Sequence, residues 1–402
     1  MLLSDLHLGD GGPGEAFEQD EALCAFLGQL AADGDVAGVV LLGDTFDLVE
    51  GAAAGRGTEA TSRALARLED IAAAHPDVLT ALAGLLRAGK DLTVVRGNHD
   101  VDLARRQVRD RLAQILESGT ERGTERGSER GSDSGSARAA GRLVFTPWLL
   151  HLPGMLLAEH GHQHHDINRF DRQLWPFPTA PTEAAEAGPV QEPFGAALSR
   201  LRHTASGPRL SAKVAGSVLR HGLRLQSPQR RRRGAHYRRA MLPGMIPGLG
   251  VPLAIAQRLD AVSERSAVQI LTRIGRQVAR GRAGGRRPED GYLPIAAGAV
   301  LRTLGPAAPP YLIYGHSHAA DAIALEPPGQ ANGPSNGRST TYLNTGTWSR
   351  RGPGPGDTTL PPAGATWVEV SDGPGHPARI CSWTNDGPRL LAEIIDGHIV
   401  RS

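Results

Sequence analysis

Five short apolar runs in this chain each lead directly into a polar block, and this repeated pattern constrains the fold more than any other feature. In the clearest case, residues 94–95 are valines that lead through Gly97 into Asn98, His99 and Asp100. A β-branched apolar run is typical of a buried strand, and a glycine lets the backbone turn at its end. Open α/β sheets bind ligands at the carboxyl ends of their strands. The pattern therefore predicts a sheet with polar side chains along one edge.

The other four blocks also follow apparent strands. They are Asp5 and His7 after residues 1–4, Asp44 and Asp47 after residues 36–42, His160 after residues 155–158, and His316 and His318 after residues 311–314. Alternate residues that leave a strand point to the same side, so Asp-X-His and His-X-His can each present two ligands to one ion. Carboxylate, amide and imidazole ligands without thiolate suit Mn, Fe or Zn. The blocks together predict a metal centre.

Helical and strand patterns alternate in the first part of the chain. Residues 18–32 and 62–87 have helical spacing, the second with an interruption at Pro76, and they lie between the apolar runs that end at residues 42 and 95. This alternation predicts an α/β fold with a parallel or mixed sheet flanked by helices. Further strands are expected near residues 340–343, 367–370 and 380–383.

Two segments differ in composition from the rest. Residues 118–141 repeat tetrapeptides such as Gly-Thr-Glu-Arg and contain no large apolar residue, which predicts a low-complexity disordered loop after a helix that ends near residue 117. Residues 176–309 are rich in Pro, Ala and Arg and are predicted to form a basic helical insertion or cap. The polar blocks then belong to one domain formed by residues 1–170 and 310–402.

The charge of the chain is concentrated in this insertion. Residues 200–287 hold 20 of the 44 Lys and Arg residues but only two acids, while the whole chain has a net charge of +2. The Arg-rich stretch 230–239 could bind nucleic-acid phosphates, although Tyr237 is its one aromatic residue for stacking. Residues 241–256 are apolar but broken by prolines and could lie on an anionic membrane. The third interpretation is a solvated insertion without a partner.

The cysteine content and the hydropathy bear on the cellular compartment. Cys24 and Cys381 are too few for a disulfide framework, so a reducing cytoplasm is expected. No signal peptide is visible, and no apolar run is long enough to span a bilayer. The prediction is a cytoplasmic protein, with the basic insertion as its means of contact with the inner face of the membrane.

Taken in order, the five blocks resemble the signature of the calcineurin-like metallophosphoesterase superfamily. That signature is Asp-X-His, Gly-Asp-X-X-Asp, Gly-Asn-His-Asp/Glu, a lone His and Gly-His-X-His. Here the blocks stand as Asp5-Leu6-His7, Gly43-Asp44-Thr45-Phe46-Asp47, Gly97-Asn98-His99-Asp100, His160-Gly161 and Gly315-His316-Ser317-His318. The resemblance covers residues 1–117, 143–170 and 310–384, and it implies a β-sandwich of two mixed sheets with helices outside and the site at one edge.

The resemblance also implies roles for these residues. One metal ion is held by Asp5, His7 and His318, the other by Asn98, His160 and His316, with Asp44 bridging the two. The ions would be two divalent metals, with Mn expected and Fe or Zn as alternatives. A hydroxide that bridges them would attack the phosphorus of a phosphate mono- or diester. Asn98 and His99 would contact the phosphate, and His99, oriented by Asp47, would protonate the leaving group.

Within the superfamily, the Gly-Asp-Thr-Phe-Asp block and the layout resemble bacterial enzymes such as the UDP-2,3-diacylglucosamine pyrophosphohydrolases. This chain departs from that branch because His99 stands where the branch carries Arg, and because Gly-His rather than Gly-Asp follows His160. The expected substrate is therefore the wider class of phosphorylated small molecules, nucleotides or lipid-linked phosphates.

Two other functions stay open. A nuclease would use the same metals with the Arg-rich insertion as its nucleic-acid track. A non-catalytic metal-binding scaffold would be expected to have lost the acid or some ligands, whereas His99 and all seven ligand positions are present here.

Some neighbours of the five blocks allow more than one interpretation. His162 lies two residues after His160, so it competes with His160 as a ligand or contacts the substrate, and His164 and His165 are expected beside the site. Asp100 either belongs to the site or only caps the next helix. Asn344 and Thr347 are expected to turn the chain rather than line the site.

Overall fold

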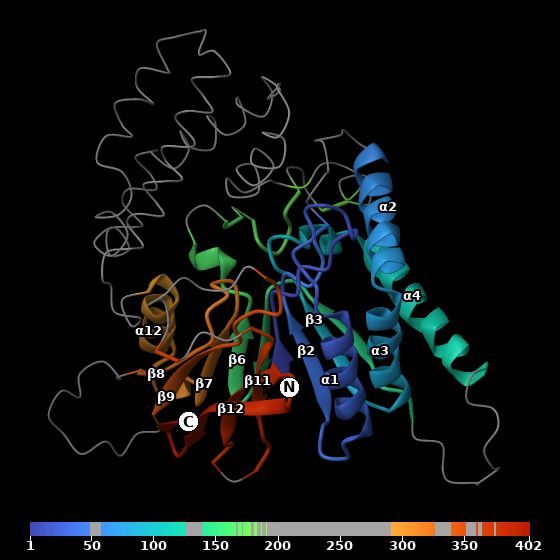
Figure 1. Cartoon of the computed structure of the whole chain (residues 1–402). Helices are drawn as coiled ribbons and strands as arrows, with labels where there is room; N and C mark the ends of the chain where they lie inside the picture. Colours follow the sequence, from blue (N-terminus) through green and yellow to red (C-terminus); the bar gives the residue numbers. More distant parts are fainter. Residues whose placement is uncertain are drawn as a thin grey trace, which may run out of the picture.

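The computed structural model describes most of the sequence outside the predicted insertion. It describes residues 1–48, 58–125, 139–165, 168–170, 172–177, 181–182, 186, 190, 291–325, 339–350, 359–360, 364–373 and 375–402. Within these residues the chain forms two β-sheets with helices on their outer faces (Figure 1).

The larger sheet has eight strands in the order β13-β12-β11-β10-β1-β2-β3-β4 within the described residues. Its parallel half comprises β1 (Leu2–Leu3), β2 (Gly38–Leu42), β3 (Asp91–Val95) and β4 (Leu143–Thr146). Its antiparallel half comprises β10 (Thr366–Val370), β11 (Ala378–Thr384), β12 (Gly387–Ile395) and β13 (His398–Arg401). The sheet is therefore mixed, as the alternation of helices and strands predicts.

The smaller sheet has five strands in the order β5-β6-β7-β9-β8 within the described part of the chain. They are β5 (Leu149–Leu152), β6 (Leu156–Glu159), β7 (Tyr311–Tyr314), β8 (Asp321–Leu325) and β9 (Thr340–Asn344). Strands β6, β7 and β9 are parallel, and the two edge strands run antiparallel to them. Residues 147–148 join β4 to β5 and so carry the chain from one sheet to the other.

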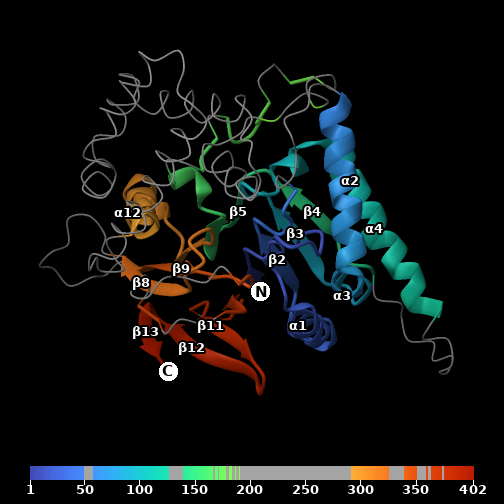
Figure 2. The ribbon, with the colours of Figure 1, turned by 45° about the horizontal axis from the view of Figure 1, so that its top comes forward.

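The helices cover the two outer faces, so the molecule has four layers (Figures 1 and 2). Helices α1 (Asp20–Ala32), α2 (Thr58–Ala74), α3 (Pro76–Arg87) and α4 (Arg106–Glu125) lie on the side of the larger sheet. Helix α12 (Tyr292–Leu304) packs on the smaller sheet. Short 3-10 turns occupy η1 (Val101–Ala104), η2 (His162–His164) and η4 (Gly305–Ala307).

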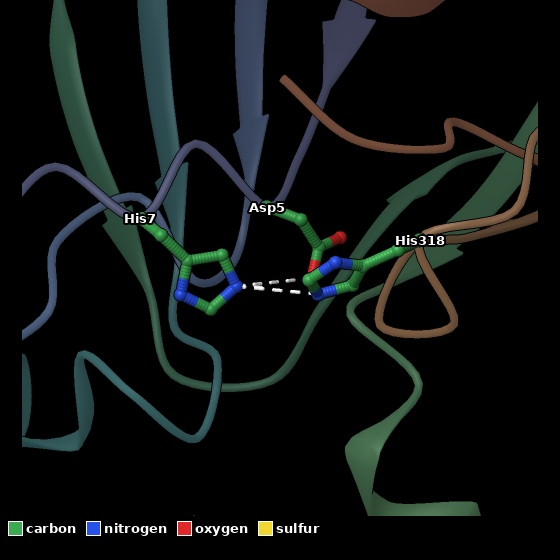
Figure 3. Close-up of side chains that lie close together, drawn as sticks. All are labelled: Asp5, His7 and His318. Atoms are coloured by element: carbon green, nitrogen blue, oxygen red, sulfur yellow. Dashed lines mark hydrogen bonds and ion pairs between the residues drawn. The ribbon is translucent and has the colours of Figure 1, made fainter. Parts of the chain in front are cut away.

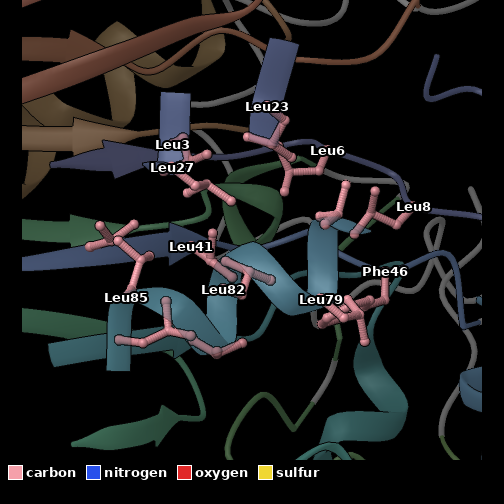
Figure 4. Packing of buried hydrophobic residues seen from close by; sticks show 14 of the residues in the cluster. Leu3, Leu6, Leu8, Leu23, Leu27, Leu41, Phe46, Leu79, Leu82 and Leu85 are labelled. Carbon is pink, nitrogen blue, oxygen red and sulfur yellow. The ribbon is translucent and has the colours of Figure 1, made fainter. Parts of the chain in front are cut away.

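Strand alternation sorts the apolar residues into separate clusters. In β2, Leu41 faces helices α1 and α3, and Leu42 faces the smaller sheet. The outer cluster includes Leu27 of α1 and Leu82 of α3, which pack beside Leu41 (Figure 4). Burial of a Leu side chain contributes about 1.5–3 kcal/mol, so these contacts hold the helices to the sheet. The two mixed sheets flanked by helices confirm the predicted fold class.

Helix α4 extends beyond its predicted end. It continues to Glu125, so the start of the loop predicted for residues 118–141 is helical. The helix buries Val108, Leu112 and Leu116 against the core, and once a packed helix exists each further residue adds a hydrogen bond at little cost. Residues 126–138 of the predicted loop lie outside the described residues.

Helix α12 lies inside the segment that the sequence assigns to the insertion. Residues 176–309 were assigned to the insertion, but α12 begins at Tyr292 and buries Leu293, Ala297 and Leu301 against the smaller sheet. An amphipathic helix belongs with the sheet that it covers, so α12 is part of the two-sheet domain. Nearly all of residues 178–290 lies outside the described part of the chain.

In the described ranges no helix has the length and apolar character needed to cross a membrane.

Candidate metal centre

The predicted site residues come together at the carboxyl ends of parallel strands from both sheets. Asp5, Asp44 and Asn98 follow β1, β2 and β3 of the larger sheet, and His160 and His316 follow β6 and β7 of the smaller sheet. Backbone hydrogen bonds continue between these loops, from the Asp5 N–H to the Gly43 carbonyl (3.1 Å) and from the Gly315 N–H to the His160 carbonyl (3.1 Å). The site therefore lies where the ends of the two sheets meet.

The first cluster of possible ligands consists of Asp5, His7 and His318. The Nε2 atom of His318 lies 3.2 Å from Oδ1 of Asp5 and 3.3 Å from Nε2 of His7. Figure 3 shows the two imidazoles and the carboxylate converging on one point from loops far apart in the sequence. This set is the one that the family resemblance implies for the first metal ion.

The second cluster consists of Asp44, His160 and His316. Nε2 of His160 lies 3.2 Å from Oδ2 of Asp44 and 3.2 Å from Nδ1 of His316. The same Asp44 oxygen lies 3.9 Å from Nε2 of His7 in the first cluster. Asp44 thus stands between the two clusters, which is the position a bridging carboxylate requires.

Hydrogen bonds turn both carboxylates toward the centre of the site. The Asp44 Oδ1 atom accepts a hydrogen bond from the His99 N–H (2.8 Å), which leaves Oδ2 facing the clusters. The Asp5 Oδ2 atom accepts hydrogen bonds from the His316 N–H (2.9 Å) and the Ser4 hydroxyl, which leaves Oδ1. Each carboxylate is therefore held by one oxygen and directs the other toward the imidazoles.

The buried oxygens in this region that accept no hydrogen bond from the described residues include Oδ1 of Asp5 and Oδ1 of Asn98. Asp5 is fully buried and Asn98 is 3 % exposed. A buried polar atom without a partner costs about 1–3 kcal/mol, so such atoms are uncommon unless a ligand satisfies them. Oxygen and imidazole donors of this kind fit a divalent cation.

Two of the candidate imidazoles are also held by their second nitrogen. Nδ1 of His160 lies 2.9 Å from the Leu42 carbonyl oxygen, and Nδ1 of His7 lies 2.7 Å from Oδ1 of Asp47. Each oxygen favours a proton on Nδ1, which leaves the lone pair of Nε2 for a metal, and metal-binding histidines are usually oriented in this way. The contact between Asp47 and His7 adds a role that the sequence did not suggest for Asp47.

His99 lies at the mouth of the site. Its Nδ1 is 3.0 Å from the same Asp47 oxygen, its ring meets the His7 ring edge-on at 4.6 Å, and 17 % of its side chain is exposed. Asp47 itself is buried. This arrangement fits the predicted pair of a proton donor and the carboxylate that orients it.

The glycines of the blocks permit close packing around the ligands. A Cβ atom on Gly97 would lie 2.2 Å from Oδ1 of Asp44, and one on Gly315 would lie 2.8 Å from Oδ2 of Asp5. Distances below 3.0 Å are not tolerated between real Cβ atoms and their neighbours. These positions therefore need glycine because another loop of the site passes directly over them.

Backbone strain is concentrated in the candidate ligands. Positive φ angles between 50° and 66° occur at five of them, namely Asp5, His7, Asp44, His316 and His318. A non-glycine residue in this region costs about 1–3 kcal/mol, and such residues persist where the surrounding structure holds them for function. The tight turns direct these side chains to a common point instead of continuing the strands.

Asp100 supports the site and does not cap a helix. Its carboxylate accepts hydrogen bonds from the N–H groups of Gly97 (2.6 Å) and Thr45 (2.9 Å), and it makes no side-chain cap to η1. The carboxylate thus joins the loops after β2 and β3, where Asp44 and Asn98 lie. Burial together with the charge of Asp44 raises the pKa of Asp100 to about 6.

His160, and not His162, lies in the second cluster. Gly161 has a left-handed backbone and is followed by the 3-10 turn η2, so the strand-like alternation expected between His160 and His162 is broken. His162 is buried, and its Nε2 lies 3.0 Å from the amide oxygen of Gln173. This burial disagrees with the predicted substrate contact of His162. Burial and the nearby His160 lower the pKa of His162 to about 3.

The charges of the site stabilise one another. Burial raises the pKa of Asp5, but the imidazoles of His318 and His160 outweigh it and hold that pKa well below its usual range. Burial lowers the pKa of His160, but Asp44 and Asp5 outweigh it and raise the pKa to about 9. Divalent cations compete with protons for such imidazoles, so metal affinity is expected to fall as the pH falls.

Four further polar residues support the site: Ser4 and Asn168, which the sequence did not single out, and Asn344 and Thr347, which were expected only to turn the chain. Ser4 contacts Asp5 and lies 2.6 Å from the Thr345 hydroxyl, and Asn168 lies 3.0 Å from Nε2 of His316. Asn344 donates to the Gly315 carbonyl and Thr347 to the Asp5 carbonyl, so both hold the backbone of ligand loops. None of these contacts has a sequence signal, because short polar residues after a strand are equally common in plain turns.

Comparison with protein families identifies the first part of the chain. Residues 1–181 match the family model of the calcineurin-like phosphoesterases. A search of curated proteins finds no match for the chain. The family match ends before His316 and His318, which the fold brings to within 3.2–3.3 Å of His160, Asp5 and His7. With the two mixed sheets and the His/Asp clusters, this match identifies residues 1–181 as belonging to the calcineurin-like phosphoesterases, a family of metal-dependent hydrolases of phosphate esters.

Proposed function

We propose that this protein hydrolyses a phosphate mono- or diester with two divalent metal ions, for which manganese is the expected metal. Asp5, His7 and His318 would hold one ion, Asn98, His160 and His316 the other, and Asp44 would contact both. The observation that carries the proposal is the position of Asp44 Oδ2, 3.2 Å from His160 of one cluster and 3.9 Å from His7 of the other. When bound, two such ions supply an activated water nucleophile and neutralise charge on the phosphate.

The chain's own residues would bind the phosphate and move a proton. His99 is partly exposed at the mouth of the site and would donate its proton to the leaving oxygen. Burial lowers the pKa of His99, but Asp44 and Asp47 outweigh it and raise the pKa above the usual value, which favours the protonated form that a general acid needs. Asp47, 3.0 Å from the His99 ring, would keep that ring oriented.

The direct test uses the manganese-loaded protein with bis-p-nitrophenyl phosphate and p-nitrophenyl phosphate as substrates. Asp44→Asn is expected to lower the metal content and to reduce hydrolysis to background. Asp91→Asn is the matched control, because Asp91 lies at the opposite end of β3 and pairs with exposed Arg142. Full activity in Asp44→Asn would refute the proposal.

The relative rates on the two substrates would narrow the substrate class. A preference for the diester directs attention to nucleotides, nucleic acids and lipid-linked phosphates, and a preference for the monoester to phosphorylated small molecules. The basic segment, residues 200–287, lies outside the described residues, so contact with a nucleic acid or an anionic membrane stays a prediction.

A further inference from the structure

The two nitrogens of His316 face different surroundings. Its Nδ1 points to the second cluster, 3.2 Å from Nε2 of His160. Its Nε2 points the other way, 3.0 Å from the amide nitrogen of Asn168 and 3.3 Å from Nδ1 of His165. The amide nitrogen of Asn168 in turn lies 2.8 Å from Nδ1 of His165. Three polar atoms therefore meet directly behind this ligand.

A histidine that binds a metal through Nδ1 must carry its proton on Nε2. That proton needs an acceptor, because an unsatisfied donor next to the site would favour the other tautomer. An Asn side chain has an oxygen and a nitrogen in nearly the same shape, so a half-turn of its amide exchanges an acceptor for a donor. Asn168 can therefore present its oxygen to His316 without any movement of the backbone.

We propose that Asn168 is a positioning residue for the second metal ion: its amide oxygen accepts the Nε2–H of His316 and so directs the Nδ1 lone pair toward Asp44 and His160. This inference rests on the proposed two-ion function. Asn168 lies outside the five sequence blocks, in the segment after η2.

His165 connects this arrangement to α12. Its ring stacks on the Tyr292 ring at the start of α12, with 4.9 Å between centroids and 21° between planes. His165 thereby holds the amide of Asn168 in place beside the His316 ring. The hydrogen bonds recorded for Asn168 in the described part of the chain go to His165 and His316 and not to Asp5, His7 or His318. Loss of Asn168 should therefore weaken the binding of the second ion and leave the binding of the first ion unchanged.

The test measures manganese binding to Asn168→Ala and Asn168→Asp by calorimetry, with electron paramagnetic resonance to detect the spin-coupled pair of ions. In Asn168→Ala the second ion is expected to bind about 10- to 100-fold more weakly, with the first unchanged. Asn168→Asp is expected to keep both ions, because a carboxylate oxygen accepts the same proton.

The variants Gln163→Ala and Gln163→Glu control for position and for charge. Gln163 lies in η2, five residues before Asn168, and its side-chain contacts are with His162 and Gln173. Both Gln163 variants should bind two ions. The affinity for the second ion should differ more between Asn168→Asp and Asn168→Ala than between Gln163→Glu and Gln163→Ala. Equal ratios would overturn the inference, because charge alone would then explain the result.

Two further outcomes would also overturn it. A coupled pair of normal affinity in Asn168→Ala would mean that His316 needs no acceptor from this residue. Equal weakness of Asn168→Asp and Asn168→Ala would mean that the amide donates a hydrogen bond instead of accepting one. Failure of the unaltered protein to bind a second ion would refute the proposed two-ion function itself, which is a separate result.

Discussion

Asp47 contacts two imidazoles with a single oxygen, 2.7 Å from His7 and 3.0 Å from His99. Burial raises the pKa of this carboxyl, but His7 and His99 outweigh it and keep the pKa far below its usual value. One buried charge thereby links a candidate ligand to the candidate acid. Replacement of His99 alone leaves the contact between Asp47 and His7 in place.

Replacement of His99 by Gln should remove the proton donor and leave metal binding intact. The turnover of an alkyl phosphate ester should fall about 100- to 10,000-fold, which is the usual contribution of a general acid. A p-nitrophenyl ester should be affected much less, because its leaving group is stable without a proton. Parallel measurement of kcat on both esters checks this expectation. An equal loss on both esters would show that His99 does not act as the acid.

A methyl group at Gly97 should disturb the metal centre without unfolding the protein. In Gly97→Ala the new Cβ would lie 2.2 Å from Asp44 Oδ1 and 2.4 Å from the Asp44 backbone nitrogen, so the Asp44 carboxylate must move. Metal stoichiometry and hydrolysis should both fall, while the far-ultraviolet circular dichroism stays unchanged. Gly28→Ala is the control, since no atom lies within 4 Å of a Cβ at that position in α1. Normal metal binding by Gly97→Ala would contradict this account of the glycine.

At the scale of elements, His75 joins the loop after β1 to helices α1 and α3. Its Nδ1 lies 2.6 Å from Asp20 of α1, its Nε2 lies 3.5 Å from Glu15, and His75 itself immediately precedes α3. Glu15 in turn accepts hydrogen bonds from the N–H groups of Gly9 and Gly11, which lie shortly after His7. The loop that follows the first metal-binding block is thus held by a charge pair.

The pH dependence of stability should reveal this pair. Burial lowers the pKa of His75, but Glu15 and Asp20 outweigh it and raise the pKa above 6.5. Burial raises the pKa of Glu15, but His75 and backbone N–H groups lower it to about 2 from 4.5. Protonated His75 contributes its whole share to the free energy of unfolding below its unfolded pKa of 6.5. That contribution is lost as the pH rises through the pKa of His75 in the folded protein. The contribution of Glu15 is full above 4.5 and is lost as the pH falls toward 2.

His75→Gln should therefore lower the free energy of unfolding most between about pH 4.5 and 6.5. Denaturant unfolding at pH 5.5 and at a pH above the folded pKa of His75 measures the difference. His151→Gln, on the exposed strand β5, is the matched control and should change little at either pH. An equal loss of unfolding free energy in His75→Gln at both pH values would refute the charge pair.

At the scale of the whole molecule, the residues of the centre come from both ends of the chain. Asp5 and His318 are separated by 313 positions in the sequence, yet their side chains lie 3.2 Å apart, because β1 and β7 end at the same edge of the sandwich. Within the described residues, the groups of possible metal ligands and the three apolar clusters are formed by residues 1–160 and 292–399.

Replacement of residues 191–290 by a flexible Gly/Ser linker should therefore keep the fold, the metal ions and the hydrolysis of bis-p-nitrophenyl phosphate. A longer deletion, of residues 191–309, should destabilise the protein strongly, because it removes α12 and exposes Leu312, Tyr314 and Tyr342. Thermal unfolding and metal analysis of the two variants compare these outcomes. Equal stability of both variants would support the predicted boundary at residue 310.

The sequence by itself determined the chemistry of the site and the fold class. Ligand types are residue identities, and strand alternation follows from a backbone period that any apolar run reveals. The runs before Asp5, Asp44, Asn98, His160 and His316 all proved to be strands. The short edge strands β5, β8 and β13 had no such signal, because none of them is an unbroken buried apolar run.

Only the tertiary structure decided between residues that the sequence pattern favoured equally for the same role. His160 and His162 are two residues apart and were expected to point the same way. The left-handed backbone at Gly161 instead directs His160 toward Asp44 and His162 toward Gln173. The hydrogen bonds of Asp100 and the contact of Asn168 with His316 likewise join loops from different strands. The helix α12 lay within a segment whose composition resembled the insertion, and only its buried face showed that it belongs to the domain. Sequence patterns report a residue's neighbours along the chain, whereas these roles depend on neighbours across space.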